Sequence, residues 1–136
     1  MYAAEILILE DDDDIREMYV EAFEDLGCKV HECSSIEQAL LKFNANKKII
    51  LGFVDYYTPG FITGYAEGEG RLAQAFKARE YFEFYFVTGS ADLTEEQAQK
   101  IGAKGILRKP LPLEKLENVV QTEILKKKQI IASLAG

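Results

Sequence analysis

Five consecutive acidic residues, from Glu10 to Asp14, directly follow an apolar segment at residues 6–9. Like charges this close repel one another unless a cation or a helix terminus compensates them. The last three acids stand where a helix is predicted to begin, and unpaired amides there stabilise negative charge. Helix capping does not explain Glu10 and Asp11, which therefore become candidates for a metal site.

Three further groups able to do chemistry close other apolar segments. Asp55 ends the segment at residues 48–55, while Thr88 and Lys109 each directly follow a later one. Carboxylates that share a pocket are costly unless they are neutralised, and Mg²⁺ prefers oxygen ligands and keeps several waters. A carboxylate beside such a cation can attack phosphorus and form an aspartyl phosphate. A lysine and a hydroxyl would then stabilise the phosphoryl oxygens.

These groups need a scaffold that brings distant segments to one edge. Short apolar segments alternate with amphipathic ones. The pattern predicts strands at residues 5–9, 28–33, 48–55, 81–87 and 104–108, and helices at 13–26, 36–43, 71–80, 95–102 and 113–127. Such alternation builds a parallel sheet covered on both faces, with binding sites beyond the carboxyl ends of the strands. We therefore predict an α/β fold with five parallel strands and five helices.

Composition narrows the class of protein further. The 136 residues suit one domain, and 48% apolar residues allow a proper core. The net charge of −7 argues against a surface that binds nucleic acid. The one basic run, residues 126–128, is expected to be a solvated helix end. We predict a single domain over residues 1–136, with a core at about 5–127 and a short C-terminal tail.

The cysteines and the histidine indicate a reducing compartment and no metal site of their own. Cys28 and Cys33 lie five residues apart in a predicted edge strand, on opposite faces, and so cannot bond to each other. His31 is expected to be an ordinary strand residue, and this set does not make a zinc site. No segment reads as a signal peptide or a membrane span, so we expect a cytoplasmic protein.

Four segments in order resemble the receiver domain of two-component response regulators. The acidic-pair segment matches ILILEDDDDIRE, the phosphoacceptor segment GFVDYYTPG, the switch-hydroxyl segment FVTGSA, and the lysine-proline segment GAKGILRKPLPLEKL. Each match is weak alone, but four in order, each closing a strand, make a specific signal. The resemblance covers about residues 5–127. It implies a CheY-like, flavodoxin-like three-layer sandwich with strand order 2-1-3-4-5.

The resemblance also implies roles in a phosphorelay. Asp55 would accept a phosphoryl group from a phosphohistidine on a sensor histidine kinase or histidine phosphotransfer protein, and would lose it by slow autodephosphorylation. The phosphorylated domain would change its affinity for an unknown downstream protein, without membrane insertion or direct contact with nucleic acid. A weak homodimer is compatible with this class. The implied residues are Glu10, Asp11, Asp55 and the backbone carbonyl of Tyr57 for Mg²⁺, and Thr88 and Lys109 for the phosphoryl group.

The sequence departs from the family pattern in three places. Ile106 stands three before the lysine, where an aromatic residue is usual, so the output rearrangement can differ from the usual coupling of threonine and aromatic ring. Gly89 follows Thr88 where alanine is common. The glycine-rich segment at residues 61–70 is longer than usual, which leaves open a disordered or remodelled third helix or a partner-specific surface.

Two other functions compete with a working phosphoacceptor. A pseudo-receiver would be an interaction module that never takes phosphate. A phosphatase of the haloacid dehalogenase type would need a second acid two residues after the nucleophile, where this chain has Tyr57. The Tyr57 ring would either hinder attacking water or simply pack on its loop.

Overall fold

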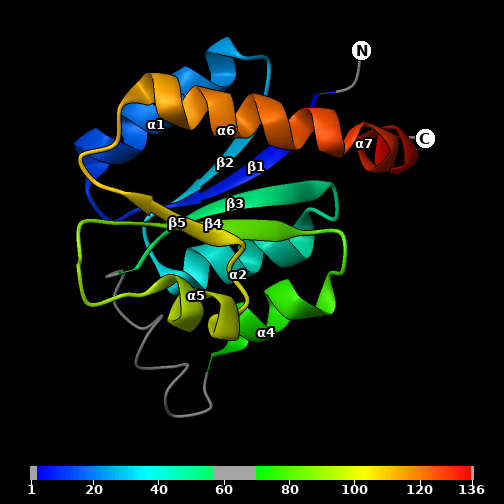
Figure 1. The fold of residues 1–136 in the computed structure, drawn as a ribbon. Coiled ribbons are helices and arrows are strands. Elements are labelled where there is room, and N and C mark those ends of the chain that lie inside the picture. The colour runs from blue at the N-terminus through cyan, green and yellow to red at the C-terminus, as the bar shows by residue number, and fades with distance from the viewer. Residues whose placement is uncertain (1–2, 57–69, 136) are drawn as a thin grey trace.

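The computed structural model describes residues 3–56 and 70–135 and is one layered α/β unit (Figure 1). Its parallel sheet has the order β2-β1-β3-β4-β5, as predicted. The strands agree with the predicted segments to within two residues: β1 (Glu5–Leu9), β2 (Lys29–Cys33), β3 (Ile49–Asp55), β4 (Glu83–Thr88) and β5 (Gly105–Arg108).

Helices cover both faces of the sheet (Figure 1). One face carries α1 (Asp13–Asp25), α6 (Leu113–Lys126) and α7 (Lys128–Ala135). The other carries α2 (Ile36–Ala45), α4 (Arg71–Ala78) and α5 (Glu95–Ile101). Predictions for residues 57–69, including the Tyr57 carbonyl and most of the glycine-rich segment, fall outside the described part of the chain.

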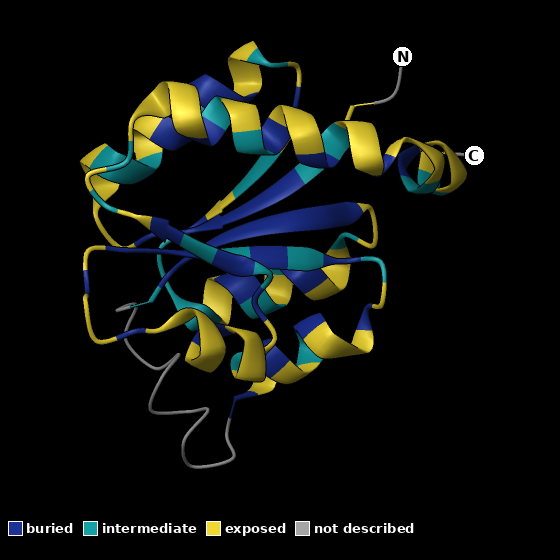
Figure 2. Ribbon diagram, in the orientation of Figure 1, coloured by how far each residue is buried: buried dark blue, intermediate teal, exposed yellow. Residues whose placement is uncertain are grey.

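The strands alternate between two apolar cores. In β1, Ile6 and Ile8 pack into the α1–α6 core, while Leu7 and Leu9 pack into the α2–α4–α5 core. Every residue of the central strand β3 is buried, which Figure 2 shows as a continuous dark band through the middle of the molecule. Side chains that point alternately to two covered faces explain why these strands read as uninterrupted apolar runs.

Capping residues fix where three of the helices begin. Asp12 caps α1 by accepting a hydrogen bond from the Ile15 amide at 3.1 Å, so the acidic run does start a helix, as predicted. Ser35 caps α2 by accepting a hydrogen bond from the Gln38 amide. Thr94 closes a capping box with Gln97 at the start of α5. The three capped helices follow β1, β2 and β4, so each begins on the carboxyl side of the sheet.

The C-terminal segment differs from its prediction as a short tail. It forms a sixth helix among the described residues, α7, which lies at an angle to α6 (Figure 1). Ile131 of α7 is buried, and Ile130 and Leu134 pack against the same core. The expectation of three solvated lysines is wrong for Lys127, which is buried at the α6–α7 junction, whereas Lys126 and Lys128 are exposed.

The two cysteines behave as predicted. Cys28 belongs to the α1–α6 core and Cys33 to the opposite core, and both are free thiols. Burial raises the pKa of each thiol to about 11, which keeps both protonated and unreactive. Among the described residues, no helix has the length and apolar character needed to cross a membrane.

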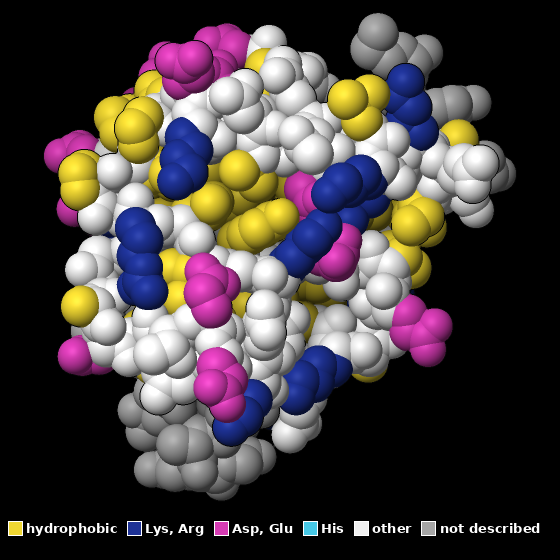
Figure 3. Space-filling view, viewed as in Figure 1, with side chains coloured by type: hydrophobic (Ala, Val, Ile, Leu, Met, Phe, Trp, Pro, Cys, Tyr) yellow, Lys and Arg dark blue, Asp and Glu magenta, His cyan; other side chains and the backbone are white. Residues whose placement is uncertain are grey.

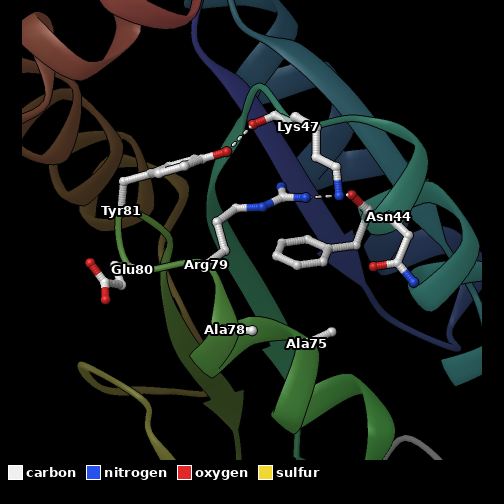
Figure 4. Close-up of a pocket in the computed structure, with 8 residues that line it drawn as sticks. Asn44, Lys47, Ala75, Ala78, Arg79, Glu80 and Tyr81 are labelled. Carbon is white, nitrogen blue, oxygen red and sulfur yellow. Dashed lines mark hydrogen bonds between the residues drawn. The ribbon is translucent and has the colours of Figure 1, made fainter.

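A buried arginine joins three elements at the amino edge of the sheet (Figure 4). The Arg79 guanidinium donates to the carbonyls of Phe43 at 2.8 Å, Asn46 at 3.0 Å and Ile49 at 3.1 Å. It also stacks over the Phe43 ring, 3.7 Å from the ring centroid. The side chain lines a surface hollow of about 460 Å³ between α2 and α4. Its donors are engaged in tying the end of α2 to β3.

Candidate functional site

The carboxyl edge of the sheet gathers the described side chains that the sequence singled out. Glu10 follows β1, Asp55 ends β3, Thr88 ends β4 and Lys109 follows β5. The parallel register sets Asp55 beside Val87 and Thr88 beside Arg108, so these strand ends lie at one level. Residues nearly a hundred positions apart in the chain therefore meet at one rim of the sheet.

Three carboxylates form a compact cluster at this rim. One oxygen from each of Glu10, Asp11 and Asp55 lies within 4.8 Å of the others. Asp11 is exposed, but Glu10 and Asp55 are only 2% and 7% exposed. Exposed acids often cluster without a metal, whereas buried carboxylates need compensation. Three oxygen donors with an open side fit Mg²⁺, which retains several waters.

Lys109 supplies part of that compensation. Its ammonium lies 2.8 Å from Glu10 Oε1. Burial favours the neutral amine, but the hydrogen bond to Glu10 and the charge of Asp55 outweigh it and raise the pKa of Lys109. The lysine is therefore a fixed cation beside the acid cluster, where it can pair with a carboxylate or with an incoming anion.

The Glu10 carboxyl changes its protonation state near neutral pH. Burial raises its pKa to about 7; the hydrogen bond from Lys109 opposes that shift, and the hydrogen bond with Asp55 adds to it. The metal-free cluster therefore lowers its repulsion by keeping a proton on Glu10 over much of the acidic range. A divalent cation would displace that proton, because carboxylates bind metals in their ionised form.

Thr88 is positioned by the backbone around it. Its side chain is 1% exposed, and its Oγ1 accepts a hydrogen bond from the Ser90 amide at 3.1 Å. The Lys109 amide donates to the Thr88 carbonyl at 2.9 Å, which links the ends of β4 and β5. The hydroxyl thus belongs both to the rim of the sheet and to the loop that leads into α5.

Arg16, which the sequence analysis did not select, fixes the backbone beneath the cluster. Its guanidinium donates to the Glu10 carbonyl at 2.9 Å and to Asp13 at 2.6 Å, and it reaches Glu32 at 3.2 Å. It therefore joins the end of β1 to α1 and to the end of β2. The available signal was a lone basic residue two positions after the end of an acidic run.

Comparison with known proteins identifies the family. The model of the response regulator receiver domain matches residues 6–121, and the chain belongs to this family. Among solved structures, a receiver domain from Clostridium thermocellum is similar with a TM-score of 0.76 and 26% identity, over 93% of this chain and 98% of that one.

Two further solved structures share the fold. A CheY-like receiver domain from Methanospirillum hungatei superposes with a TM-score of 0.77 and 23% identity, over 93% of this chain and 98% of that one. The chemotaxis response regulator CheY4 of Vibrio cholerae gives a TM-score of 0.71 and 23% identity, over 89% and 98%. The predicted CheY-like fold and family are therefore confirmed.

Proposed function

We propose that this chain is a single receiver domain whose Asp55 accepts a phosphoryl group in a two-component phosphorelay. The observation that carries the proposal is the convergence of Asp55 with Glu10, Asp11 and Lys109 at one rim of the sheet. The donor would be a phosphohistidine on a sensor histidine kinase or a histidine phosphotransfer protein. The domain itself would be a phosphoacceptor rather than an enzyme with a separate substrate.

In the transfer step, a carboxylate oxygen of Asp55 attacks phosphorus, a new oxygen–phosphorus bond forms and the phosphorus–nitrogen bond to histidine breaks. The electron pair of that bond stays with the imidazole, which leaves as neutral histidine because its other ring nitrogen carries a proton. Lys109 moves its ammonium from Glu10 toward a phosphoryl oxygen, and the Thr88 hydroxyl donates to another.

The acid cluster supports Mg²⁺ as the cofactor. Glu10, Asp11 and Asp55 would hold the ion, with the backbone carbonyl of Tyr57 as the further ligand that the resemblance implies. When bound, the ion supplies positive charge that neutralises the phosphoryl oxygens as they approach the carboxylates. Slow hydrolysis of the aspartyl phosphate at the same site would return the domain to its starting state.

Phosphorylation would act as a bias on a two-state equilibrium, because the new charge favours the conformer in which Thr88 and Lys109 contact it. The surface next to Thr88 and β5 is where a downstream protein would sense the change. On that face, Figure 3 shows hydrophobic side chains between α6 and the sheet, with lysines and arginines at the margin. A hollow of about 230 Å³ there is lined in part by Tyr85, Val119 and Lys115.

The test is phosphorylation by a small-molecule donor. Wild-type protein incubated with Mg²⁺ and acetyl phosphate should gain the mass of one phosphoryl group, and Asp55→Asn should gain none. Asp14→Asn is the matched control, since it removes an exposed carboxylate from the first turn of α1 and should behave as wild type. A folded wild-type protein that every donor leaves unmodified would instead identify a pseudo-receiver, the alternative that Ile106 supports.

A further inference from the structure

The loop between β4 and α5, residues 89–94, is clamped by a side chain from the neighbouring strand. Arg108, the last residue of β5, lies beside Thr88 in the sheet register. Its guanidinium donates from Nη1 to the Ser90 carbonyl and from Nη2 to the Leu93 carbonyl, the latter at 2.6 Å. The planar fork of arginine suits such paired contacts.

The same loop also holds the hydroxyl of Thr88. The Ser90 amide donates to Thr88 Oγ1 at 3.1 Å, and Ser90 Oγ accepts from the Asp92 amide at 3.0 Å. Ser90 is 9% exposed and Leu93 is fully buried. Ser90 is therefore bound on both sides, through its amide by Thr88 and through its carbonyl by Arg108. A movement of the Ser90 backbone therefore affects both contacts.

We propose that Arg108 is a positioning residue that latches this loop, and through it Thr88, in the arrangement of the unphosphorylated protein. The inference rests on the proposed function, because it concerns the response of the loop to a phosphoryl group on Asp55. When the Thr88 hydroxyl turns toward that group, the Ser90 amide loses its acceptor and the loop shifts. Arg108 must then release two carbonyls, so its contacts favour the resting state and oppose the phosphorylated one.

The neighbouring strand gives a reason for an arginine at this position. Ile106, two residues earlier in β5, is an aliphatic side chain with no polar group. Its side chain therefore cannot form a hydrogen bond with the loop. Arg108 instead donates hydrogen bonds to two backbone carbonyls of the loop. Both carbonyls belong to buried residues. Partly buried hydrogen bonds from a charged donor are strong enough to bias two conformers.

A purely electrostatic role for Arg108 predicts the opposite sign. A cation near the rim would attract a phosphoryl group, so its removal would weaken binding of any anionic mimic. The latch predicts that its removal strengthens binding, because the resting state loses the contacts that favour it. The direction of the change therefore separates the two roles.

The experiment is a titration of wild type and variants with beryllofluoride, a phosphoryl mimic, at saturating Mg²⁺, followed by backbone amide NMR signals. Arg108→Ala should bind with a half-saturating concentration about fivefold lower than wild type, the change that about 1 kcal/mol produces. Arg108→Lys keeps the charge but not the fork, and should fall between the two. Lys128→Ala, which removes an exposed cation from α7, should not bind more tightly than wild type.

A second readout needs no ligand. In metal-free Arg108→Ala, the Ser90 amide should exchange with solvent faster than in wild type, while amides in β1 should not change. Unchanged or weaker beryllofluoride binding by both Arg108 variants, with wild type binding normally, would overturn the latch alone. A wild type that does not bind the mimic would overturn the proposed function, and the latch with it.

Discussion

At the scale of single residues, the ionisation of Glu10 determines whether the acid cluster can bind a cation. It is buried between Lys109 and Asp55, and its pKa is raised from 4.5 to about 7. The folded, metal-free protein therefore keeps a proton that the unfolded chain has already lost in this interval. Between about pH 4.5 and 7 this group makes the free energy of unfolding fall as pH rises, and above pH 7 its effect is constant.

Saturating Mg²⁺ should abolish that pH dependence, because the metal-bound protein, like the unfolded chain, carries an ionised Glu10 in this interval. Binding requires ionised Glu10, so affinity for Mg²⁺ should increase as pH rises through about 7 and then level off. Urea midpoints measured from pH 5 to 8, with and without Mg²⁺, and calorimetric titration in buffers of different ionisation enthalpy should both report the released proton. Glu10→Gln should flatten the pH dependence of the metal-free protein. An equally steep pH dependence in that variant would assign the effect to another group.

That the candidate site residues meet could be predicted because strand ends share an edge. That rule placed Glu10, Asp55 and Lys109 together without any contact information. Arg16 and Arg108 were not predicted, since the contacts that tie them to the rim go to the backbone carbonyls of Glu10, Ser90 and Leu93, which no residue pattern displays. The raised pKa of Glu10 could not be predicted from the sequence either, because it depends on burial in the folded state. Sequence thus predicts which reactive groups meet, and the structure adds the side chains that hold them.

At the scale of elements, the C-terminal helices differ most from the sequence-based expectation. The segment 128–135 was too short for its apolar spacing to distinguish a helix from a tail. Its stability comes from tertiary contacts instead, through the burial of Ile131 and a charge network at the junction. Lys127 pairs there with Glu83 and with Glu123, and Lys104 lies 2.7 Å from Glu123.

Loss of the Lys127 ammonium should destabilise the fold. Lys127→Met keeps most of the aliphatic stem but leaves Glu123, which is almost fully buried, with Lys104 as its main remaining counter-charge. Because Lys104 still compensates Glu123, we expect a loss of about 2 kcal/mol, typical of a hydrogen bond to a charged group, rather than the larger loss that an uncompensated buried charge causes.

Urea unfolding measures this loss directly. Lys128→Met is the matched control, because Lys128 is exposed at the start of α7 and its replacement should change the midpoint little. Equal midpoints for the two variants would show that the network contributes no more than a surface lysine.

At the scale of the whole molecule, the sheet separates a reactive edge from a structural one. The acid cluster, Thr88 and Lys109 lie at the carboxyl edge, while Arg79 ties α2 to β3 at the amino edge. Both edges use buried charge, but in different ways. At the amino edge the charge is satisfied by carbonyls and a ring, which leaves a stable scaffold. At the carboxyl edge carboxylates face one another, an arrangement that a cation and a phosphoryl group can change.

This division predicts that stability and ligand binding can be altered separately. Arg79→Met should unfold more easily by about 3 kcal/mol, because three carbonyls, two of them in buried hydrogen bonds, lose a charged donor. Its affinity for beryllofluoride with Mg²⁺, measured well below the unfolding temperature, should stay within about twofold of wild type, since distant independent sites are nearly additive. Arg71→Met, an exposed arginine replaced on α4, is the control. If Arg79→Met instead weakened beryllofluoride binding while remaining folded, the amino edge would be coupled to the site through β3, whose first and last residues touch the two groups of charges.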